Sequence, residues 1–312
     1  MKLRKILEAF TINKKKLASG KYEVVKGGTG RSSDEDSYDE DDDDEDSLGL
    51  DTLNAEKLKM YHNLKTGRKT WVKSYTDLED KYGSSQFNKL DFTEQDERGF
   101  VEYVAFSLMR YLKKYAPQIK IPNHIRLAYE DDPNSNAPSF QVATSSFKNL
   151  KQAREGIKND VYRNLVIDIY LFMILIGHAD LHRGNVIVKS KDEYYIIDPE
   201  LTLQDYDRAL ELGRDQMEFT TEPYFKYNSS YKKIADQYAK VMKINVKEEF
   251  GPIIDKCIDV AVKAMLKEGL NIEELQEEKD HLKYLKGKIL YNIEKNKKYI
   301  QTHFRKYYDV EN

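Results

Sequence analysis

Residues 177–200 constrain the fold more than any other stretch of this chain. They read GHADLHRGNVIVKSKDEYYIIDPE and directly follow a long apolar run, residues 165–176. The apolar run predicts a helix buried on most sides, and two β-like runs, residues 186–188 and 194–197, predict a hairpin. The buried helix would hold the polar loop rigidly, and the hairpin would end on an acid. This order of helix, polar loop, hairpin and acid predicts an α+β protein.

The polar positions of this stretch resemble the catalytic core of the protein-kinase-like superfamily. Asp180 and Asn185 match the Asp and Asn of the catalytic loop, and Asp198 matches the metal-binding Asp that follows it. Their separations, five and then thirteen residues, are those that protein kinases use. The resemblance implies a two-lobed α+β fold, with a small β-rich N-lobe (residues 1–147) and a larger helical C-lobe (residues 148–312).

The same resemblance implies ATP-dependent phosphoryl transfer from a catalytic loop, residues 178–185. Asp180 would orient the acceptor hydroxyl and take its proton, while His182 would stabilise the loop. Asn185 would turn back toward the metal. The cofactors implied are ATP and Mg²⁺, with Mn²⁺ as an alternative metal.

A second loop, residues 198–200, would complete the metal site. Asp198 would bind Mg²⁺ together with Asn185, and Glu200 would support a second ion, because hard cations prefer oxygen ligands.

Two departures from protein kinases narrow the resemblance. His178-Ala179-Asp180 replaces their His-Arg-Asp, and Asp198-Pro199-Glu200 replaces their Asp-Phe-Gly. The HxDxHxxN form is similar to aminoglycoside, choline and related small-molecule kinases, to phosphoinositide kinases and to atypical bacterial effector kinases. Because the Arg is missing, we do not expect switching by activation-loop phosphorylation.

The N-lobe supplies the candidate nucleotide-binding residues. Large residues alternate around a Gly-containing turn in residues 58–75, which predicts a hairpin. Its second strand resembles the kinase strand whose Lys contacts the phosphates, which gives Lys73 that role, or Lys69 if the register slips. The helix predicted next should offer an acid to hold this Lys; Glu102 is our choice and Glu97 the alternative.

Two further segments complete the predicted nucleotide site. A predicted strand, residues 22–25, precedes a Gly-rich run in which Gly27, Gly28 and Gly30 would let backbone N–H groups approach phosphates; a flexible linker is the alternative. Another predicted strand, residues 138–145, would lead into the hinge that meets adenine, through Ala143 and Ser145.

An acidic low-complexity tract occupies residues 32–50. It contains eleven acids and no base between positions 34 and 46. The whole chain has a net charge of −3, so the chain without these acids has a net charge of −3 − (−11) = +8. Such a tract buries too little apolar area to order itself, which predicts a disordered insertion. It would act as a solvated spacer, or alternatively would screen the basic surface or inhibit the site.

The rest of the chain is predicted to be mainly helical, and the following ranges have helical periodicity: 92–115, 159–176, 228–243, 247–268 and 273–308. Cys257 lies on an apolar helical face, which predicts a small core residue, and one cysteine fits a reducing compartment.

The longest apolar run is too short to span a bilayer, so we expect a cytosolic protein, in a host cytosol if it is a secreted bacterial effector.

The phosphate acceptor stays open at this point. A protein Ser/Thr is favoured, because size and composition resemble atypical bacterial effector kinases. A small molecule is an alternative, for which four acids after the metal loop could line a pocket: Asp205, Asp207, Glu211 and Asp215. An inositol lipid that contacts the basic last helix, nucleotidyl transfer on the same fold and a catalytically dead scaffold are further alternatives. No zinc-ligand spacing or nucleic-acid module is found.

Overall fold

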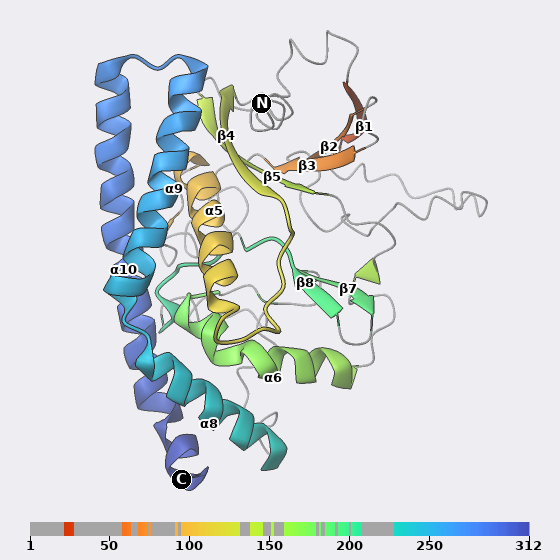
Figure 1. The fold of residues 1–312 in the computed structure, drawn as a ribbon, viewed down its shortest axis with the longest axis vertical. Helices are drawn as coiled ribbons and strands as arrows, with labels where there is room; N and C mark the ends of the chain where they lie inside the picture. The colour runs from red at the N-terminus through yellow and green to blue at the C-terminus, as the bar shows by residue number, and fades with distance from the viewer. Residues whose placement is uncertain are drawn as a thin grey trace, which may run out of the picture.

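The structure, a computed structural model, describes the following residues of the chain: 22–27, 58–63, 68–73, 75, 91–92, 95–131, 138–145, 151–152, 159–178, 181, 185–190, 193–199, 201–207 and 228–311. They form an α+β protein in which an antiparallel five-stranded sheet precedes a mainly helical C-terminal region (Figure 1). The predicted fold class is confirmed at this level. The acidic tract lies outside the described residues.

The larger sheet has the strand order β1-β2-β3-β5-β4, and all neighbours are antiparallel. Its strands are β1 (Tyr22–Gly27), β2 (Leu58–Asn63), β3 (Arg68–Lys73), β4 (Ile125–Asp131) and β5 (Pro138–Ser145). The hairpin predicted from the alternating residues is confirmed, since β2 and β3 pair from Asn63 with Arg68 to Leu58 with Lys73. Strand β4 begins at Ile125 and pairs with β5 along its whole length.

Helix α5 (Gln95–Leu112) packs against this sheet with its apolar face. Phe100, Val104, Leu108 and Leu112 are fully buried and recur every three or four residues, as one face of a helix requires. Gly99 allows the close approach, since a Cβ there would overlap the carbonyl oxygen of Phe140 on β5.

The described part of the C-terminal region contains a small sheet and four long helices. The sheet has the order β6-β7-β8, and the elements are β6 (Lys151–Gln152), α6 (Asn159–Leu175), β7 (Val186–Ser190), β8 (Glu193–Ile196), α8 (Asn228–Lys243), α9 (Val246–Glu268) and α10 (Ile272–Glu311). Helices α9 and α10 run side by side as a long hairpin (Figure 1). Asn245 caps the start of α9, and Gly269, at φ 93°, ends it.

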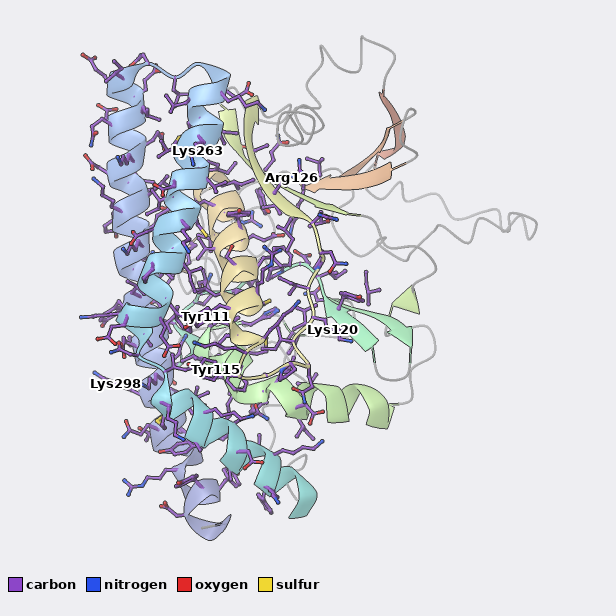
Figure 2. All side chains as sticks on the ribbon, viewed as in Figure 1. Tyr111, Tyr115, Lys120, Arg126, Lys263 and Lys298 are labelled. Carbon is purple, nitrogen blue, oxygen red and sulfur yellow. The ribbon has the colours of Figure 1, made fainter. Side chains whose placement is uncertain are left out.

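Helix α9 also contacts the back of α5, near the tyrosines labelled in Figure 2. Glu249 Oε2 of α9 accepts hydrogen bonds from the hydroxyls of Tyr111 and Tyr115, each at 2.6 Å. Lys114 Nζ lies 2.8 Å from the same oxygen. The C-terminal hairpin is thereby tied to the helix that carries Glu102.

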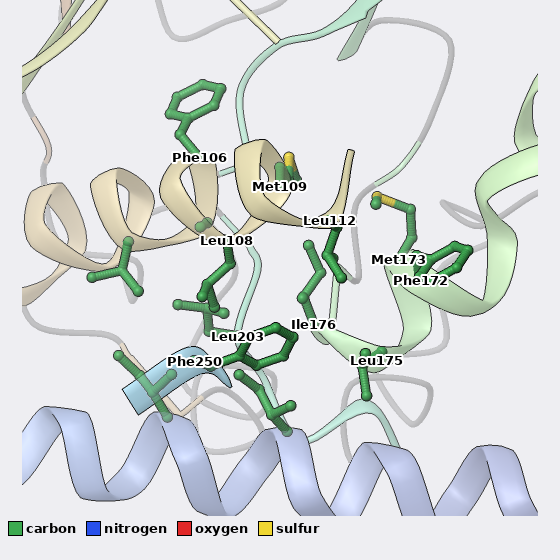
Figure 3. Packing of buried hydrophobic residues seen from close by; sticks show 14 of the residues in the cluster. Phe106, Leu108, Met109, Leu112, Phe172, Met173, Leu175, Ile176, Leu203 and Phe250 are labelled. Atoms are coloured by element: carbon green, nitrogen blue, oxygen red, sulfur yellow. The ribbon is translucent and has the colours of Figure 1, made fainter. Parts of the chain in front are cut away.

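One apolar core joins these layers. Figure 3 shows Met109 and Leu112 of α5 packed near Phe172 and Ile176 of the α6 region, with Phe250 of α9 beside them. Cys257 is 3% exposed within this core, which confirms its prediction as a small core residue. In the described part of the chain, no helix is long and apolar enough to cross a membrane.

Candidate active site

Three residues from distant parts of the chain meet between the larger sheet and the small one. Lys73, the last residue of β3, places its Nζ 3.1 Å from Glu102 Oε2 of α5. The same Nζ forms an ion pair with Asp198, which follows β8. The Lys73 side chain is 14% exposed, Glu102 3% and Asp198 8%. An ammonium held between two carboxylates is therefore almost withdrawn from water.

Helix α5 determines where the Glu102 carboxylate lies. The contact of Gly99 with the Phe140 backbone and the contact of the Phe100 and Phe140 rings, with centroids 6.0 Å apart, fix this part of α5 on β5. Since β5 is also the neighbour of β3, with Val142 opposite Lys73, the carboxylate faces the lysine across one strand.

The polar loop and the hairpin place Asp198 next to Asn185. Ile197 N donates a hydrogen bond to Asn185 O at 2.9 Å, and Ile196 N donates to Lys120 O at 2.8 Å. The backbone of Asp198 is left-handed, with φ 53°, a conformation that Asp and Asn adopt more readily than most residues. Asn185 is 3% exposed. The backbone of Asn185 is therefore bonded to the residue that precedes Asp198, at the end of the hairpin.

Tyr75 belongs to this cluster and was missed by the sequence analysis. Its hydroxyl donates to Glu102 Oε2 at 2.8 Å, and its ring is fully buried. Lys73 Nζ and the guanidinium of Arg98 each lie 5.2 Å from the centre of this ring, within cation–π distance. The sequence feature that could have identified Tyr75 is its spacing of two residues from Lys73, because side chains two residues apart in an extended chain lie on the same face.

The charges of the cluster stabilise one another. Burial alone would lower the pKa of Lys73, but the Asp198 and Glu102 carboxylates outweigh it and raise that pKa above the usual value. Burial raises the pKa of Glu102, opposed chiefly by Lys73. Burial and the Glu102 charge raise the pKa of Tyr75, so its hydroxyl remains a hydrogen-bond donor. Lys73 is thus a permanent cation at neutral pH.

Glu97 and Lys69, the alternatives to Glu102 and Lys73, lie elsewhere in the structure. Glu97 lies 3.2 Å from His281 Nε2 of α10. Lys69 is opposite His62 on β2, four residues before Lys73. The cluster described above therefore contains Lys73 and Glu102, and neither alternative.

The remaining predicted site residues are only partly described. Gly27 ends β1 and pairs with Lys59, and on β5 Ala143 pairs with Val72 and Ser145 with Thr70. The following predicted residues lie outside the described part of the chain: Gly28, Gly30, Asp180, His182 and Glu200.

The acidic pocket considered for a cationic substrate is not formed by Asp205. This carboxylate is 4% exposed and forms an ion pair with Lys295 of α10. Asp207 is exposed, and Glu211 and Asp215 lie outside the described residues.

No protein-family model and no curated protein matches the sequence. One similar solved structure is described as WaaP in complex with acyl carrier protein, with 10% sequence identity over 76% of this chain and 86% of that chain, at a TM-score of 0.24. A TM-score this low does not by itself define a shared fold.

Proposed function

We propose that this chain is an ATP-dependent phosphotransferase with a protein-kinase-like fold, whose N-lobe spans residues 1–147 and whose C-lobe spans residues 148–312. The observation that carries the proposal is the ion-paired cluster of Lys73, Glu102 and Asp198, from β3, α5 and the end of the β7–β8 hairpin. In protein kinases a strand lysine, a helix glutamate and a metal-binding aspartate must all be in place for transfer.

In this proposal Lys73 neutralises phosphate charge and Glu102 keeps the ammonium in position. Phosphoryl transfer needs little covalent help from the protein, so most of the catalysis comes from positioning and charge neutralisation. A lysine fixed by a buried carboxylate reaches the phosphates without further ordering. The Lys73–Asp198 ion pair opens when the nucleotide binds, which frees the Asp198 carboxylate for a metal.

The donor set suits Mg²⁺. The carboxylate of Asp198 and the amide oxygen of Asn185 are hard ligands, and the backbone bond from Ile197 to Asn185 keeps the two residues adjacent. The described residues contain no group of three or more His, Cys, Asp or Glu able to hold a metal. That is compatible with Mg²⁺, which commonly takes one or two carboxylates and completes its shell with phosphates and water. Bound Mg·ATP would supply the transferable phosphoryl group and the charge that stabilises its transfer.

Asp180 is assigned to the acceptor hydroxyl, with His182 supporting its loop and Glu200 supporting a second ion. The Gly27–Gly30 run would cover the phosphates, and the end of β5, with Ala143 and Ser145, would approach adenine. We assign a protein Ser or Thr as the acceptor, with the protein acting in the cytosol. Small-molecule, inositol-lipid and nucleotidyl-transfer activities become outcomes of the test.

The test is self-labelling with ATP that carries the label at the γ- or the α-phosphate. We expect wild type to take label from the γ-phosphate only, and to lose it with EDTA. Lys73→Met and Asp180→Ala should lower the rate by about 100-fold or more, since each removes charge stabilisation or the base. Lys263→Met, an exposed lysine labelled in Figure 2, is the matched control and should keep the wild-type rate.

Other outcomes contradict the proposal in distinct ways. Label from the α-phosphate would establish nucleotidyl transfer. If Lys73→Met were labelled as fast as wild type, the cluster of Lys73, Glu102 and Asp198 would not take part in phosphoryl transfer. If ATP with Mg²⁺ stabilised the wild type against heat but no protein became labelled, small-molecule and lipid acceptors would replace the protein acceptor. If neither labelling nor stabilisation occurred, the chain would be a scaffold.

A further inference from the structure

Two asparagines are buried on the inner face of α10, a helix whose other described polar residues are exposed or half-buried. Asn292 is 3% exposed and Asn296 is 1% exposed, and their spacing of four puts them on the same face. A buried amide is unfavourable unless its donors and acceptors are hydrogen-bonded. The partners of these two amides therefore indicate why they are there.

Asn296 connects the chain after Asp198 to the end of α6. Its Oδ1 accepts a hydrogen bond from Tyr206 N at 2.8 Å. Its Nδ2 donates to Gln204 O at 2.9 Å and to Leu175 O at 3.3 Å. Leu175 is the last residue of α6, just before the polar loop that contains Asn185.

Asn292 connects the segment that follows Asp198 to the start of α5. Its Nδ2 donates to Leu203 O at 3.0 Å and to Asp91 Oδ2 at 3.1 Å. Asp91 Oδ2 also accepts from Asp205 N at 2.9 Å, and Asp91 N donates to Gln204 Oε1 at 2.6 Å. Asp91 precedes α5, the helix that carries Glu102. We call Asp91, residues 203–206, Asn292 and Asn296 the polar junction.

The polar junction is held by two lysines at its edge. Lys295 forms an ion pair with Asp205, and Lys288 donates to the carbonyl oxygen of Asp91. Lys288 Nζ also lies 4.8 Å from the ring centre of Phe92, which is 2% exposed. Helix α10 thus supplies two asparagines of the junction and two lysines that contact it, all within about two turns of the helix.

The backbone around the junction is tight. Gly177 has φ 60°, and a Cβ there would overlap Gln204 O and crowd Asn296 Nδ2. Leu203 has φ 68°, which is unusual for a residue with a side chain, and its N–H donates to Ile176 O at 2.8 Å. Such a backbone persists only when its surroundings over-determine it, and here the buried amides supply that constraint.

We propose that Asn292 and Asn296 are positioning residues for the active site: by fixing residues 203–206 against the ends of α5 and α6, they set the place of Asp198 relative to Glu102. This inference rests on the proposed function. The three segments that meet at the junction lead directly to α5, to the polar loop and to Asp198. A change in the polar junction would therefore shift all three of these site elements.

The first experiment measures hydrogen exchange of the protein without nucleotide. Asn292→Ala and Asn296→Ala should increase exchange in the peptide that contains residues 193–207, while the part of α10 around the buried Leu282 and Leu285 keeps its protection. The matched control is Ile300→Val, one turn further on the same face, which is fully buried and loses only a methyl group. It should lower the melting temperature without changing exchange in residues 193–207.

The second experiment measures the Mg²⁺ concentration that gives half-maximal stabilisation by ATP, with each protein kept equally far below its own melting temperature. The asparagine variants should need about tenfold more Mg²⁺, which is the usual effect of removing support from a metal ligand. Ile300→Val should match wild type.

A charge exchange separates positioning from loss of stability. Asn292→Asp places a carboxylate against Asp91 and should increase the Mg²⁺ requirement. Adding Asp91→Asn removes the repulsion and restores one hydrogen bond, so the double variant should recover part of the wild-type value.

The outcomes distinguish the two proposals. If wild type shows no Mg²⁺-dependent response to ATP, the proposed function is wrong and this inference falls with it. If wild type responds but the asparagine variants keep its Mg²⁺ requirement, or exchange in residues 193–207 is unchanged, the inference alone is overturned.

Discussion

Tyr75 donates its phenolic hydrogen to Glu102 Oε2, the same oxygen that lies 3.1 Å from Lys73 Nζ. One carboxylate oxygen therefore holds a neutral donor and a cation together, inside a region from which water is nearly excluded. The tyrosine adds no charge, so it stabilises the ionised Glu102 without placing a second cation beside Lys73.

Tyr75→Phe tests this contact, because it removes only the hydroxyl. Burial raises the pKa of Glu102 and the Tyr75 hydrogen bond opposes that rise, so the variant should have a still higher Glu102 pKa. A buried hydrogen bond to a charged group contributes about 1.5–3 kcal/mol, which is the loss expected in the free energy of unfolding. Urea denaturation at pH 7 measures it. Tyr284→Phe, at a residue that is 65% exposed, is the control and should differ little from wild type.

Glu249→Gln tests the tie between α9 and α5 through its pH dependence. Burial alone would raise the pKa of Glu249, but hydrogen bonds from Lys114, Tyr111, Tyr115 and the Asn245 backbone hold it at about 2. Because this pKa is below the ordinary value of 4.5, the ionised group stabilises the fold above pH 4.5. That stability is lost as the pH falls from 4.5 toward 2.

In Glu249→Gln we expect a loss of about 1–2 kcal/mol at pH 7 and a flatter decline below pH 4.5, since the titrating group is gone. Urea midpoints measured from pH 7 to pH 2.5 check both. Glu268→Gln, at an exposed position, serves as the control. A variant whose stability falls as steeply as that of wild type would show that Glu249 does not carry this pH dependence.

Glycines in two helices should respond to alanine in opposite directions. Gly99→Ala should destabilise the fold by about 1–3 kcal/mol, because the new methyl group overlaps the Phe140 carbonyl and pushes α5 away from β5. Gly287→Ala should stabilise it by about 0.5–1 kcal/mol, since nothing lies within 4 Å of the new Cβ and alanine favours a helix. Thermal unfolding of both variants checks the signs. Equal effects would contradict the close packing at Gly99.

Cys257 should be unreactive in the folded protein. Its side chain is 3% exposed, and burial raises the pKa of its thiol to about 11. The thiolate is the reactive form, so a thiol reagent at pH 8 should modify Cys257 only as fast as the protein opens. The same reagent should react at once in denaturant. Rapid modification under native conditions would contradict the buried position between α9 and α5.

The local patterns of the sequence were sufficient for most of the described elements, although β6 (Lys151–Gln152) was not predicted. The predicted hairpin became β2 and β3, and the helix predicted over residues 92–115 became α5, somewhat shorter at each end. These successes depend on side-chain periodicity and turn residues, which act over a few positions.

The partners of Lys73 and of the junction required the folded chain. A family resemblance in the sequence pointed to Lys73 and Glu102. It did not indicate that Tyr75 donates a hydrogen bond to Glu102, that Asp198 forms an ion pair with Lys73, or that Glu97 lies beside His281. Asn292 and Asn296 gave no signal in a lysine-rich helix. Their importance comes from burial against residues about 90 positions away. Periodicity determines which face of a helix is apolar, whereas tertiary packing decides which buried polar groups meet, because only the folded chain removes them from water and makes each depend on a partner.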